Sequence, residues 1–453
     1  MKRALKYLAS ISLLFAITAC GSGGSTGGST TPPATTTTIE GTLLDMGDPL
    51  NPPGSGWLPV IPTALNDSAV AVGRSGGSAF YWDAKTPTVQ MSWMPTHFDA
   101  GITYDGTATL PYATPVAIDN GGYVIGYSTT TNDPDDTKSR ASAYDISTSS
   151  FIDLFFAGNP AATASKPVDI TENGLIALTA QGLPAGFSDP SYPSLDPTSD
   201  TVQRAYIIDR DNVLGGGTYA TYFPLFPSAT GATTAVAVNR EGWLVYTDGD
   251  GNGYWYKPSI GAGTIANVEG ETWTPVDINS SATIDSTTGE PRPHIVGNNG
   301  DFGFFWEAGA AYTIGEAGGG PYTVVAINDN DQVLVNTPTE AYMWQLVNGA
   351  GVLTNVGDLG GGNTQGVDIN NLGQITGWSA TGDADPSGNA IVHAFIWSNG
   401  TIQDVGTHDY FYPYVFDEAY PYSQSVDINN AGDITGYSQS NTGNSRGFVR
   451  LVN

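Results

Sequence analysis

A short acidic run, Asp248-Gly249-Asp250-Gly251-Asn252-Gly253, has the side chains and glycines of a calcium loop. Alternating oxygens at Asp248, Asp250 and Asn252 would wrap a hard cation, and glycine permits the tight turn. Twelfth in that register is Ser259 instead of the glutamate of an EF-hand, and no helical pattern flanks the run. Two readings follow: a calcium site of another architecture with these three residues as metal ligands, or an acidic hairpin turn without an ion, which is the default.

Aromatic side chains concentrate in two long segments, His408–Ser423 (HDYFYPYVFDEAYPYS) and Ser92–Thr114. Aromatic rings beside carboxylates suit stacking on sugar rings or gripping a partner protein. We therefore predict a ligand-binding set in these segments: Tyr410, Phe411, Tyr412, Tyr414, Tyr420, Tyr422 and Trp93. The alternative is that these aromatic side chains pack on one another and hold a long loop in place.

Sequence motifs of catalysis are missing. His97, His294, His393 and His408 are scattered, with no pair at metal-ligand spacing, and the chain has no G-x-S-x-G, P-loop or H-E-x-x-H motif. The chain has 44 acidic residues, so a carboxylate pair of the glycosidase type is neither supported nor excluded. We assign no catalytic residue, and whether the chain is an enzyme stays open, with a non-enzyme favoured.

The N-terminus carries the signals of a bacterial lipoprotein. Basic residues precede an apolar run, and Ile17-Thr18-Ala19-Cys20 looks like a lipobox, which predicts a signal peptide over 1–19 and a lipidated Cys20. Gly21 in the next position resembles lipoproteins sorted to the outer membrane. Residues 20–38 hold the lipidated cysteine and a Gly/Ser/Thr-rich tether. We expect an outer-membrane or cell-surface lipoprotein of Gram-negative type, with its body outside the cytoplasm and the lipid anchor as its only membrane contact.

Charge and cysteine content narrow the partners. The formal charge of −29 would repel nucleic acid and anionic membrane surfaces, so neither is expected as a partner. Cys20 is the only cysteine, which excludes an internal disulfide, so the fold must be stabilised by packing. A glycan or a surface protein remains as the expected partner, with Ca²⁺ as the one candidate cofactor.

One sequence anchor recurs eight times between residues 39 and 453. It reads VDIN or a close variant and starts at Thr63, Val116, Val168, Val236, Val276, Val325, Val367 and Val426. Successive anchors lie 40 to 68 residues apart, about 52 on average. A period of that size suits one blade of a β-propeller.

A small-then-aromatic pair follows each anchor, for example Ala394-Phe395 and, in the second unit, Ala143-Tyr144. Between them, β-branched and aromatic residues alternate with Asn, Gly and Asp turn residues, which is typical of short antiparallel strands joined by hairpins. The fold predicted for residues 39–453 is an all-β propeller, most simply of eight four-stranded blades. Seven blades is the alternative, because the 68-residue interval before Asn239 is irregular.

The two ends of the chain predict how the ring closes. The last unit stops at Asn453 before a fourth strand, and a strand of the missing type, Gly41–Gly47, precedes the first anchor. Propellers commonly close by letting one terminus complete the blade that the other began, so that no sheet edge is left open. We therefore expect Leu43–Met46 beside Phe448–Leu451.

Some strings resemble a known family of repeats. INNLGQITGWS (Ile369–Ser379), HAFIWSNG (His393–Gly400) and DINNAGDITGYS (Asp427–Ser438) look like HAF repeats, a family of predicted extracellular bacterial repeats. The resemblance is close over 351–453 and is limited to anchors and pairs over 41–350. It implies an extracellular propeller-like domain and brings no catalytic residues.

Four anchors carry Asp at the second position, namely Asp169, Asp277, Asp368 and Asp427, where the others have Ala64, Ala117, Ala237 and Ala326. If the anchor strand is innermost, these carboxylates approach the central channel and would form a cation site. The alternative, which is favoured, is that they accept hydrogen bonds from backbone N–H groups of turns.

The long insertions favour one face of the ring. Loops between second and third strands and crossovers from a fourth strand to the next blade emerge together, and both kinds are long here: Thr131–Arg140, Gly186–Gln203, Thr381–Ala390, Ser92–Thr114 and His408–Ser423. Loops on a rigid scaffold are where binding residues concentrate. Two hypotheses follow: a surface-anchored, non-catalytic binding or adhesion module for a glycan or protein, or a polysaccharide-active hydrolase or lyase on the same scaffold.

Overall fold

The computed structural model describes most of the chain after residue 39. The described residues are 40–46, 59–86, 91–97, 99–101, 103–104, 108–133, 137–154, 164–214, 218–225, 228, 230–265, 273–286, 289–316, 320–407, 422–439 and 445–452. The predicted signal peptide, Cys20 and the tether lie outside them.

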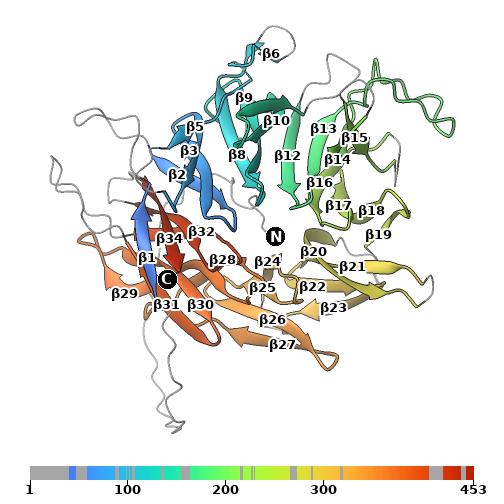
Figure 1. The fold of residues 1–453 in the computed structure, drawn as a ribbon. Coiled ribbons are helices and arrows are strands. Elements are labelled where there is room, and N and C mark those ends of the chain that lie inside the picture. The colour runs from blue at the N-terminus through green and yellow to red at the C-terminus, as the bar shows by residue number, and fades with distance from the viewer. Residues whose placement is uncertain are drawn as a thin grey trace.

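Eight four-stranded antiparallel sheets form a closed ring, as Figure 1 shows. Each innermost strand contacts the innermost strands of both neighbouring blades, and β32 of the last blade contacts β2 of the first. The predicted eight-bladed propeller is therefore confirmed, and eight blades, not seven, is the count. The long interval before Asn239 is one blade whose second and third strands are joined by a long insertion.

Blades are numbered in chain order, and the strands of each blade are given from the innermost to the outermost. Blades 1 to 4 are β2 (Val60–Leu65), β3 (Val70–Ser75), β4 (Ser78–Asp83), β5 (Ser92–Trp93); β8 (Tyr112–Ile118), β9 (Tyr123–Thr129), β10 (Ser139–Asp145), β11 (Ser150–Asp153); β12 (Ser165–Ile170), β13 (Leu175–Gln181), β14 (Gln203–Leu214), β15 (Thr218–Tyr222); and β16 (Thr233–Val238), β17 (Leu244–Asp248), β18 (Gly253–Lys257), β19 (Gly261–Thr264).

The second half of the ring repeats this order. Blades 5 to 8 are β20 (Thr274–Ile284), β21 (Pro291–Asn299), β22 (Phe302–Glu307), β23 (Ala310–Ile314); β24 (Thr323–Ile327), β25 (Val333–Asn336), β26 (Ala341–Val347), β27 (Ala350–Asn355); β28 (Thr364–Ile369), β29 (Ile375–Ala384), β30 (Ala390–Ser398), β31 (Thr401–Gly406); and β32 (Tyr422–Ile428), β33 (Ile434–Gln439), β34 (Ser445–Val452) with β1 (Gly41–Asp45). A separate hairpin, β6 (Thr103–Tyr104) and β7 (Ala108–Thr109), lies in the crossover from blade 1 to blade 2.

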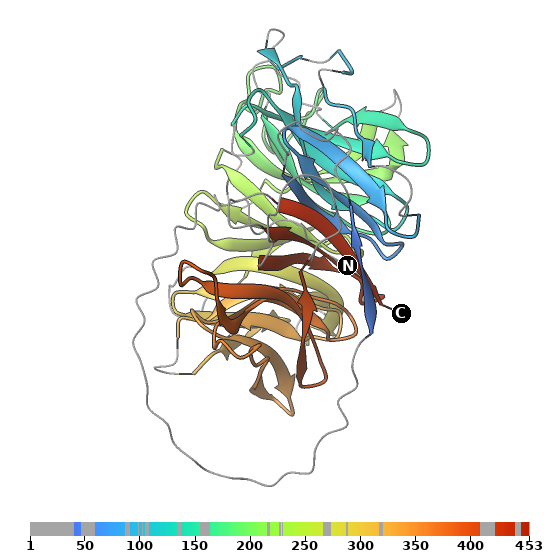
Figure 2. The ribbon, with the colours of Figure 1, turned by 90° about the vertical axis from the view of Figure 1, so that its left-hand side faces the viewer.

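The ring closes as predicted, through β1. This strand pairs antiparallel with β34, with Leu43 opposite Arg450 and Leu44 opposite Val449. Figure 2 shows β1 in blue alongside the red strands of the last blade. Met46, Val449 and the partly buried Leu44 belong to one apolar cluster with blade 1, so closure also joins two blades through their cores.

All eight anchors begin at the same structural feature. In every innermost strand the ladder register shifts at the first anchor residue, which makes a β-bulge, as at Val367 between Gly366 and Asp368. Gly377 faces Gly366 across this ladder, and a Cβ at Gly377 would lie 1.9 Å from the carbonyl oxygen of Gln365. The glycine of the repeated I-T-G-W-S string is therefore required by a close backbone approach.

The turn after each innermost strand reaches the next blade. Six of these turns carry an Asn whose side-chain amide donates to the backbone carbonyl at the same position one blade on, over 2.8 to 3.0 Å: Asn66, Asn239, Asn279, Asn328, Asn370 and Asn429. In blades 2 and 3 the position holds Asp119 and Thr171. There Asp119 pairs with Arg210 of blade 3, so an ion pair joins the two blades.

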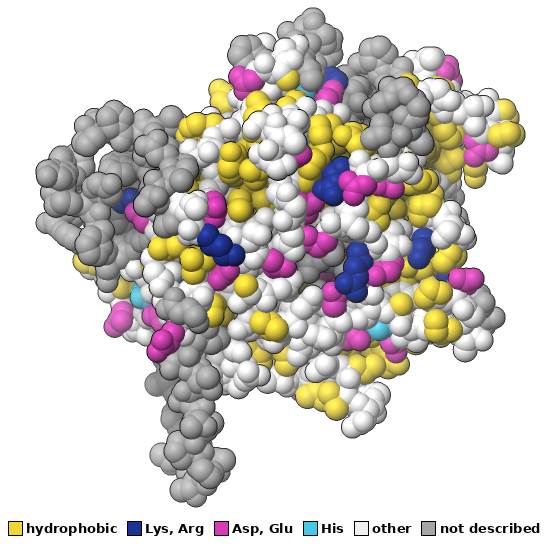
Figure 3. Space-filling view, viewed as in Figure 1, with side chains coloured by type: hydrophobic (Ala, Val, Ile, Leu, Met, Phe, Trp, Pro, Cys, Tyr) yellow, Lys and Arg dark blue, Asp and Glu magenta, His cyan; other side chains and the backbone are white. Residues whose placement is uncertain are grey.

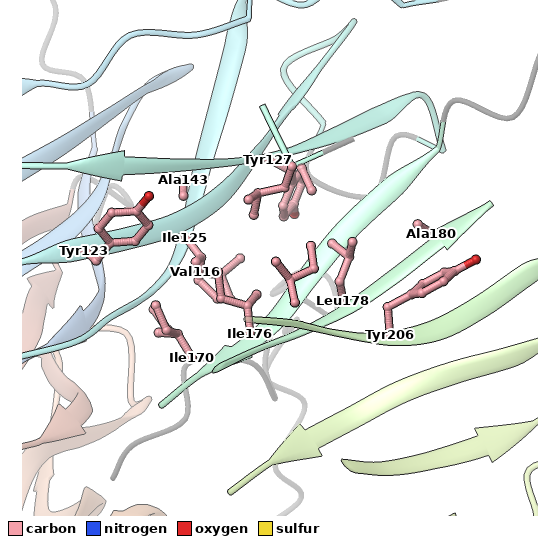
Figure 4. Packing of buried hydrophobic residues seen from close by; sticks show 14 residues of the cluster. Val116, Tyr123, Ile125, Tyr127, Ala143, Ile170, Ile176, Leu178, Ala180 and Tyr206 are labelled. Carbon is pink, nitrogen blue, oxygen red and sulfur yellow. The ribbon is translucent and has the colours of Figure 1, made fainter. Parts of the chain in front are cut away.

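Neighbouring blades pack face to face through buried apolar side chains. Figure 4 shows Val116, Ile125 and Tyr127 of blade 2 against Ile176, Leu178 and Tyr206 of blade 3. Each large apolar side chain buried in this way contributes about 1.5 to 3 kcal/mol. Repeated around the ring, this packing makes a rigid support for the loops at the two ends of the blades.

Candidate functional site

The antiparallel order of the strands defines two faces. The insertion-rich face is the end of the blades where turns between second and third strands and the crossovers between blades emerge; the opposite face carries the turns between first and second strands. All five long segments singled out in the sequence therefore reach the insertion-rich face. Several of their ends belong to blade strands; for example, Ser92–Trp93 is β5 and Tyr112–Thr114 begins β8.

One hydrogen bond joins two of these segments. Tyr422, at the start of β32, donates its hydroxyl to Asp385 Oδ2 over 2.8 Å, and Asp385 lies in the turn between β29 and β30. Burial and this bond raise the pKa of Tyr422 to about 12. Hydrogen bonds from the side chain and backbone of Asn389 lower the pKa of Asp385 to about 2. The hydroxyl of Tyr422 is thus held by a carboxylate that is ionised at neutral pH.

A histidine–aspartate pair lies where the same crossover leaves blade 7. His393 Nδ1 lies 2.8 Å from Asp404 Oδ2, and both side chains are partly exposed. Asp404 Oδ1 accepts from Gly406 N–H at the end of β31, and Ser423 Oγ donates to the carbonyl of Gly406. The described ends of the 408–421 crossover are therefore flanked by Tyr422 with Asp385 on one side and His393 with Asp404 on the other.

The remaining predicted aromatic residues fall into two groups. Tyr410, Phe411, Tyr412, Tyr414 and Tyr420 lie outside the described residues. Trp93 is only partly buried, but it packs against the apolar cluster of blade 1 with Phe80 and Trp82. Of the two predicted ligand-binding residues that the structure describes, Tyr422 has a polar partner on the insertion-rich face, whereas Trp93 packs in a core cluster.

The predicted calcium loop forms the turn between β17 and β18. Asp248 Oδ1 accepts from the N–H groups of Asp250 and Asn252, and Oδ2 accepts from the Asn252 amide and the Tyr254 hydroxyl, over 2.9 to 3.0 Å. These donors satisfy the Asp248 carboxylate without an ion, which is the geometry of the acidic hairpin turn. Asp250 is exposed and contributes its backbone N–H.

The same turn recurs in blade 7 without the second acid. Asp385 Oδ1 accepts from the N–H groups of Ser387 and Asn389 over 2.8 Å, and a glycine with positive φ, Gly388, precedes the Asn as Gly251 does in blade 4. Each turn also receives a tyrosine hydroxyl on its Asp, from Tyr254 or from Tyr422. Within the described residues, no three His, Cys, Asp or Glu side chains are grouped so that they could hold a metal ion. Calcium binding at Asp248, Asp250 and Asn252 stays a prediction.

The four anchor carboxylates join the blades. Asp169, Asp277, Asp368 and Asp427 are 1 to 6% exposed. One oxygen of each accepts from a backbone N–H of the next blade, over 2.7 to 3.2 Å: those of Val238, Ile327, Ile428 and Leu65. The favoured alternative, hydrogen bonding to the backbone, is therefore what the structure shows, although the donors follow bulges and do not belong to turns.

This bonding explains where the anchors carry Asp and where they carry Ala. In the next blade, the donor is the N–H of the third anchor residue. The Asp at the second position can also accept from an N–H of its own strand: Asp277 Oδ1 accepts from Ile278 N–H over 2.5 Å. Ala64, Ala237 and Ala326 each stand one blade after an Asp, so their strands receive a carboxylate from the preceding blade. Ala117 follows Ala64 and is the exception.

A hollow lies where these turns meet around the ring axis on the opposite face. It is small and open to solvent, and Asp169, Asn239, Asn279, Asp329 and Asn371 are among the residues that line it. On the face that Figure 3 draws, most dark-blue basic side chains lie beside magenta acidic ones. The side chains of Asn239, Asn279 and Asn371 are engaged in the bonds between blades, so the hollow is a product of ring closure.

One group of polar side chains, Ser128, His97 and Asp153, was not predicted from the sequence. His97, in the crossover from blade 1 to blade 2, lies with Nδ1 2.9 Å from Ser128 Oγ and Nε2 3.4 Å from Asp153 Oδ1. Burial lowers the pKa of His97. The pKa of Asp153 is also lowered, because hydrogen bonds from His97 and Arg140 and the Arg140 charge outweigh the effect of burial.

This Ser-His-Asp set fixes the crossover to the blade. His97 is fully buried and Ser128 is 1% exposed, so no substrate reaches the hydroxyl. The residues lie 31 and 56 positions apart, a spacing that carries no motif. The only available signal was the Gly-Tyr-Ser string at Ser128, whose counterpart Ser379 likewise accepts from a crossover, at Leu359 N–H.

Comparisons with known proteins add little. No protein-family model matches the chain, and no curated protein matches its sequence. A chain from the crystal structure of the mitotic checkpoint complex is 11% identical, with 97% of this chain and 100% of that chain covered and a TM-score of 0.37. The GH74 enzyme of Niastella koreensis is 10% identical, with 82% of this chain and 57% of the enzyme chain covered and a TM-score of 0.28, so this chain spans little more than half of the enzyme's length.

At these values neither likeness bears on what the chain binds or does. The resemblance to HAF repeats stays a prediction. Among the described residues, no helix has the length and apolarity needed to cross a membrane.

Proposed function

We propose that the mature chain is a surface-anchored, non-catalytic binding module that recognises a glycan or a protein with its insertion-rich face. The observation that carries the proposal is the contact of Tyr422 with Asp385, because it joins two separate insertions of that face into one aromatic and acidic surface. Rigid blades beneath these loops reduce the entropy that binding must overcome.

The location and partners in this proposal follow from the sequence. Lipidation at Cys20 would hold the chain at the outer membrane or cell surface, and the tether of residues 20–38 would let the propeller stand away from the lipid. An extracellular HAF-type propeller fits this setting. The net charge of −29 makes nucleic acid an unsuitable partner.

Among the described residues, the burial of the Ser128–His97–Asp153 set favours binding without turnover over catalysis. Ser128 is 1% exposed and its partner His97 is fully buried, so this set is unsuited to attack on a substrate. A polysaccharide-active enzyme is the alternative, since His393 and Asp404 form a histidine–carboxylate pair on the same face as Asp385. The two hypotheses differ in whether a bound glycan is ever cleaved.

The test is a glycan and protein array read for both retention and product release. Replacing Tyr422 by Ala, or Tyr410, Tyr412 and Tyr414 together, should abolish retention. A matched control is Tyr312→Ala, because Tyr312 also donates to a carboxylate, Glu307 Oε1 over 3.1 Å, but at the other end of a blade. Cleavage of any retained glycan would overturn the non-catalytic proposal, and equal retention by the Tyr422 and Tyr312 variants would overturn the assigned face.

A further inference from the structure

Most blades carry an aromatic ring at one position of the third strand, opposite the second strand. In four blades this residue is a buried phenylalanine opposite a glycine: Phe80 opposite Gly73, Phe304 opposite Gly297, Phe395 opposite Gly377 and Phe448 opposite Gly436. Blades 3, 4 and 6 have a tyrosine there: Tyr206, Tyr254 and Tyr342.

Each of the four phenylalanine rings fills the same space between two blades. A Cβ at Gly73, Gly297 or Gly436 would lie 2.7 Å from the phenylalanine ring, so the ring covers the glycine. All four phenylalanines belong to apolar clusters shared with the preceding blade. The fold therefore holds room for one phenyl ring at this place in the interface between blades.

Of the eight third strands, only that of blade 2 lacks an aromatic residue at this position. Blade 2 keeps the glycine, Gly126, but the residue opposite is Ser142. A second position is small as well: Ala113 lies three residues before the anchor, where blade 1 has Val60 and blade 5 has Trp273. Blade 2 therefore presents less side-chain volume to the preceding blade than blades 1 and 5 do.

A pocket lies at this place, between blades 1 and 2. It is partly open to solvent and mostly apolar, and Ala113, Gly126 and Ser142 line it. Its other walls include side chains of both blades and of the crossover between them: Ala79, Met94, Pro95, Tyr127, Tyr144 and Phe151. The Ser142 hydroxyl is directed to the carbonyl oxygen of Gly126, 3.5 Å away. The pocket thus follows from the replacement of an aromatic residue by serine, because protein interiors are otherwise closely packed.

We infer that this pocket binds a small, uncharged molecule through a single aromatic ring, a phenyl or phenol group. The ring would take the place that the chain fills with its own phenylalanine in four other blades. Tyr144 and Phe151 offer aromatic walls to it, and the flexible side chain of Met94 can adapt to it. Apolar cavities left when a large side chain is removed stay dry and bind molecules of the size of benzene.

The chemistry of the walls sets the ligand class. No charged side chain is among the described residues that line the pocket, so burial of a charged ligand would be uncompensated. The site lies between blades 1 and 2, whereas Tyr422 and Asp385 belong to blades 8 and 7. Binding of an aromatic ring here is therefore independent of the proposed recognition of a glycan or protein.

The experiment compares two alcohols whose six-membered rings differ in aromaticity. The full chain is titrated with benzyl alcohol and with cyclohexylmethanol, and binding is followed by ligand-detected NMR. We expect saturable binding of benzyl alcohol and about fivefold weaker binding of cyclohexylmethanol, whose thicker ring cannot stack on the aromatic walls. A glycine–phenylalanine–glycine peptide is titrated alongside as a source of the same ring on a polypeptide.

Filling the pocket supplies the second readout. Ser142→Phe restores the residue of four other blades, so the affinity for benzyl alcohol should fall at least about tenfold and the melting temperature should rise. Ser142→Ala is the matched control, because it removes the hydroxyl without filling the space and should keep the parental affinity. Ala113→Val, which introduces the residue of blade 1, should lower the affinity about threefold and keeps the test decisive if Ser142→Phe does not fold.

Each contrary outcome overturns a stated part of the inference. No saturable binding of benzyl alcohol, or a parental affinity in both Ser142→Phe and Ala113→Val, would overturn the site. Equal binding of the two alcohols would overturn the aromatic ligand class. Binding that appears only in Phe98→Ala would show that the pocket is occupied by the chain itself, and a peptide affinity tenfold above that of benzyl alcohol would make the occupant a protein side chain. The glycan and protein array tests the proposed function separately.

Discussion

Asn429 donates its side-chain amide to the backbone carbonyl of Asn66 over 2.9 Å, although 363 residues separate the two in sequence. The Asn429 oxygen meanwhile accepts from the N–H groups of Ala431 and Asp433 in its own turn. The same side chain therefore shapes a turn and joins the last blade to the first. The ring is thus closed twice: at its rim by the pairing of β1 with β34, and near its axis by the bond between Asn429 and Asn66.

Replacing Asn429 by Ala should destabilise the chain by about 3 kcal/mol, because buried donors and acceptors lose their partners in two blades at once. The measurement is the free energy of unfolding by denaturant titration. Asn389→Ala is the matched control, since Asn389 bonds only within its own exposed turn and should cost about 1 kcal/mol or less. Equal costs for the two variants would contradict the role given to Asn429.

The anchor carboxylates predict an order of stabilities. Asp277→Ala removes the acceptor of two N–H groups, those of Ile278 and Ile327. Asp368→Ala removes the acceptor of the Ile369 N–H alone, because the N–H of Ile428 still has Asp427. We expect Asp277→Ala to lower the free energy of unfolding by about 2 kcal/mol more than Asp368→Ala does in the same denaturant titration. A reversed order would show that the carboxylates do not act through these bonds.

Removing β1 should open the ring. A chain that starts at Met46 loses the partner strand of β34, the apolar contacts of Leu43 and Leu44, and the Asp45 partner of Arg446. We expect loss of a single cooperative thermal transition, followed by calorimetry, and aggregation through the exposed edge. A chain that starts at Glu40 keeps β1 and should melt as the parent does; similar melting of both chains would mean that β1 is dispensable.

His97 should make the blade 1–2 junction sensitive to acid. Burial lowers its pKa in the folded chain from the usual value of 6.5, so the unfolded chain binds the proton more tightly and stability falls as the pH drops below about 6.5. Between pH 7.5 and 5.5 the parent should lose up to about 1 kcal/mol more than His97→Gln. The measurement is denaturant unfolding at both pH values. His393→Gln, a change at a partly exposed histidine, should keep the parental loss, and a parental loss that persists in His97→Gln would contradict the assignment.

Much of the fold could be predicted from the sequence because the repeats encode backbone features. The V-D-I-N string marks a bulge and a turn, and the glycine of I-T-G-W-S marks a close approach, so both recur in register. One pair was misplaced. In blade 1 the aromatic residue of the pair, Phe80, lies opposite Gly73 of the neighbouring strand. In blade 2 the residue opposite the equivalent glycine, Gly126, is Ser142. The pair of blade 2 is therefore Ala141-Ser142 and not Ala143-Tyr144. Ala141 and Ala143 lie two positions apart and so on the same face of β10, and sequence pattern alone cannot tell which of the two alanines begins the pair.

The site could be predicted only in part. Loop length and composition identified the insertion-rich face and Tyr422, but Trp93 packs against a core cluster because a tryptophan beside a fourth strand fits either role. Contacts between blades, such as Arg210 with Asp119 across 91 residues, depend on how far side chains reach and leave no local pattern. The reason why some anchors carry Asp and others Ala at the second position could not be predicted either, because each carboxylate bonds to the backbone of the next blade.

The most direct test of the binding face is hydrogen–deuterium exchange of the full chain with and without the tightest-binding probe of the array. The account predicts slower exchange in 381–390 and 422–425 on the insertion-rich face, with no change in the turns 240–242 and 371–373 on the opposite face. Protection confined to those turns, with 381–390 and 422–425 unchanged, would contradict it.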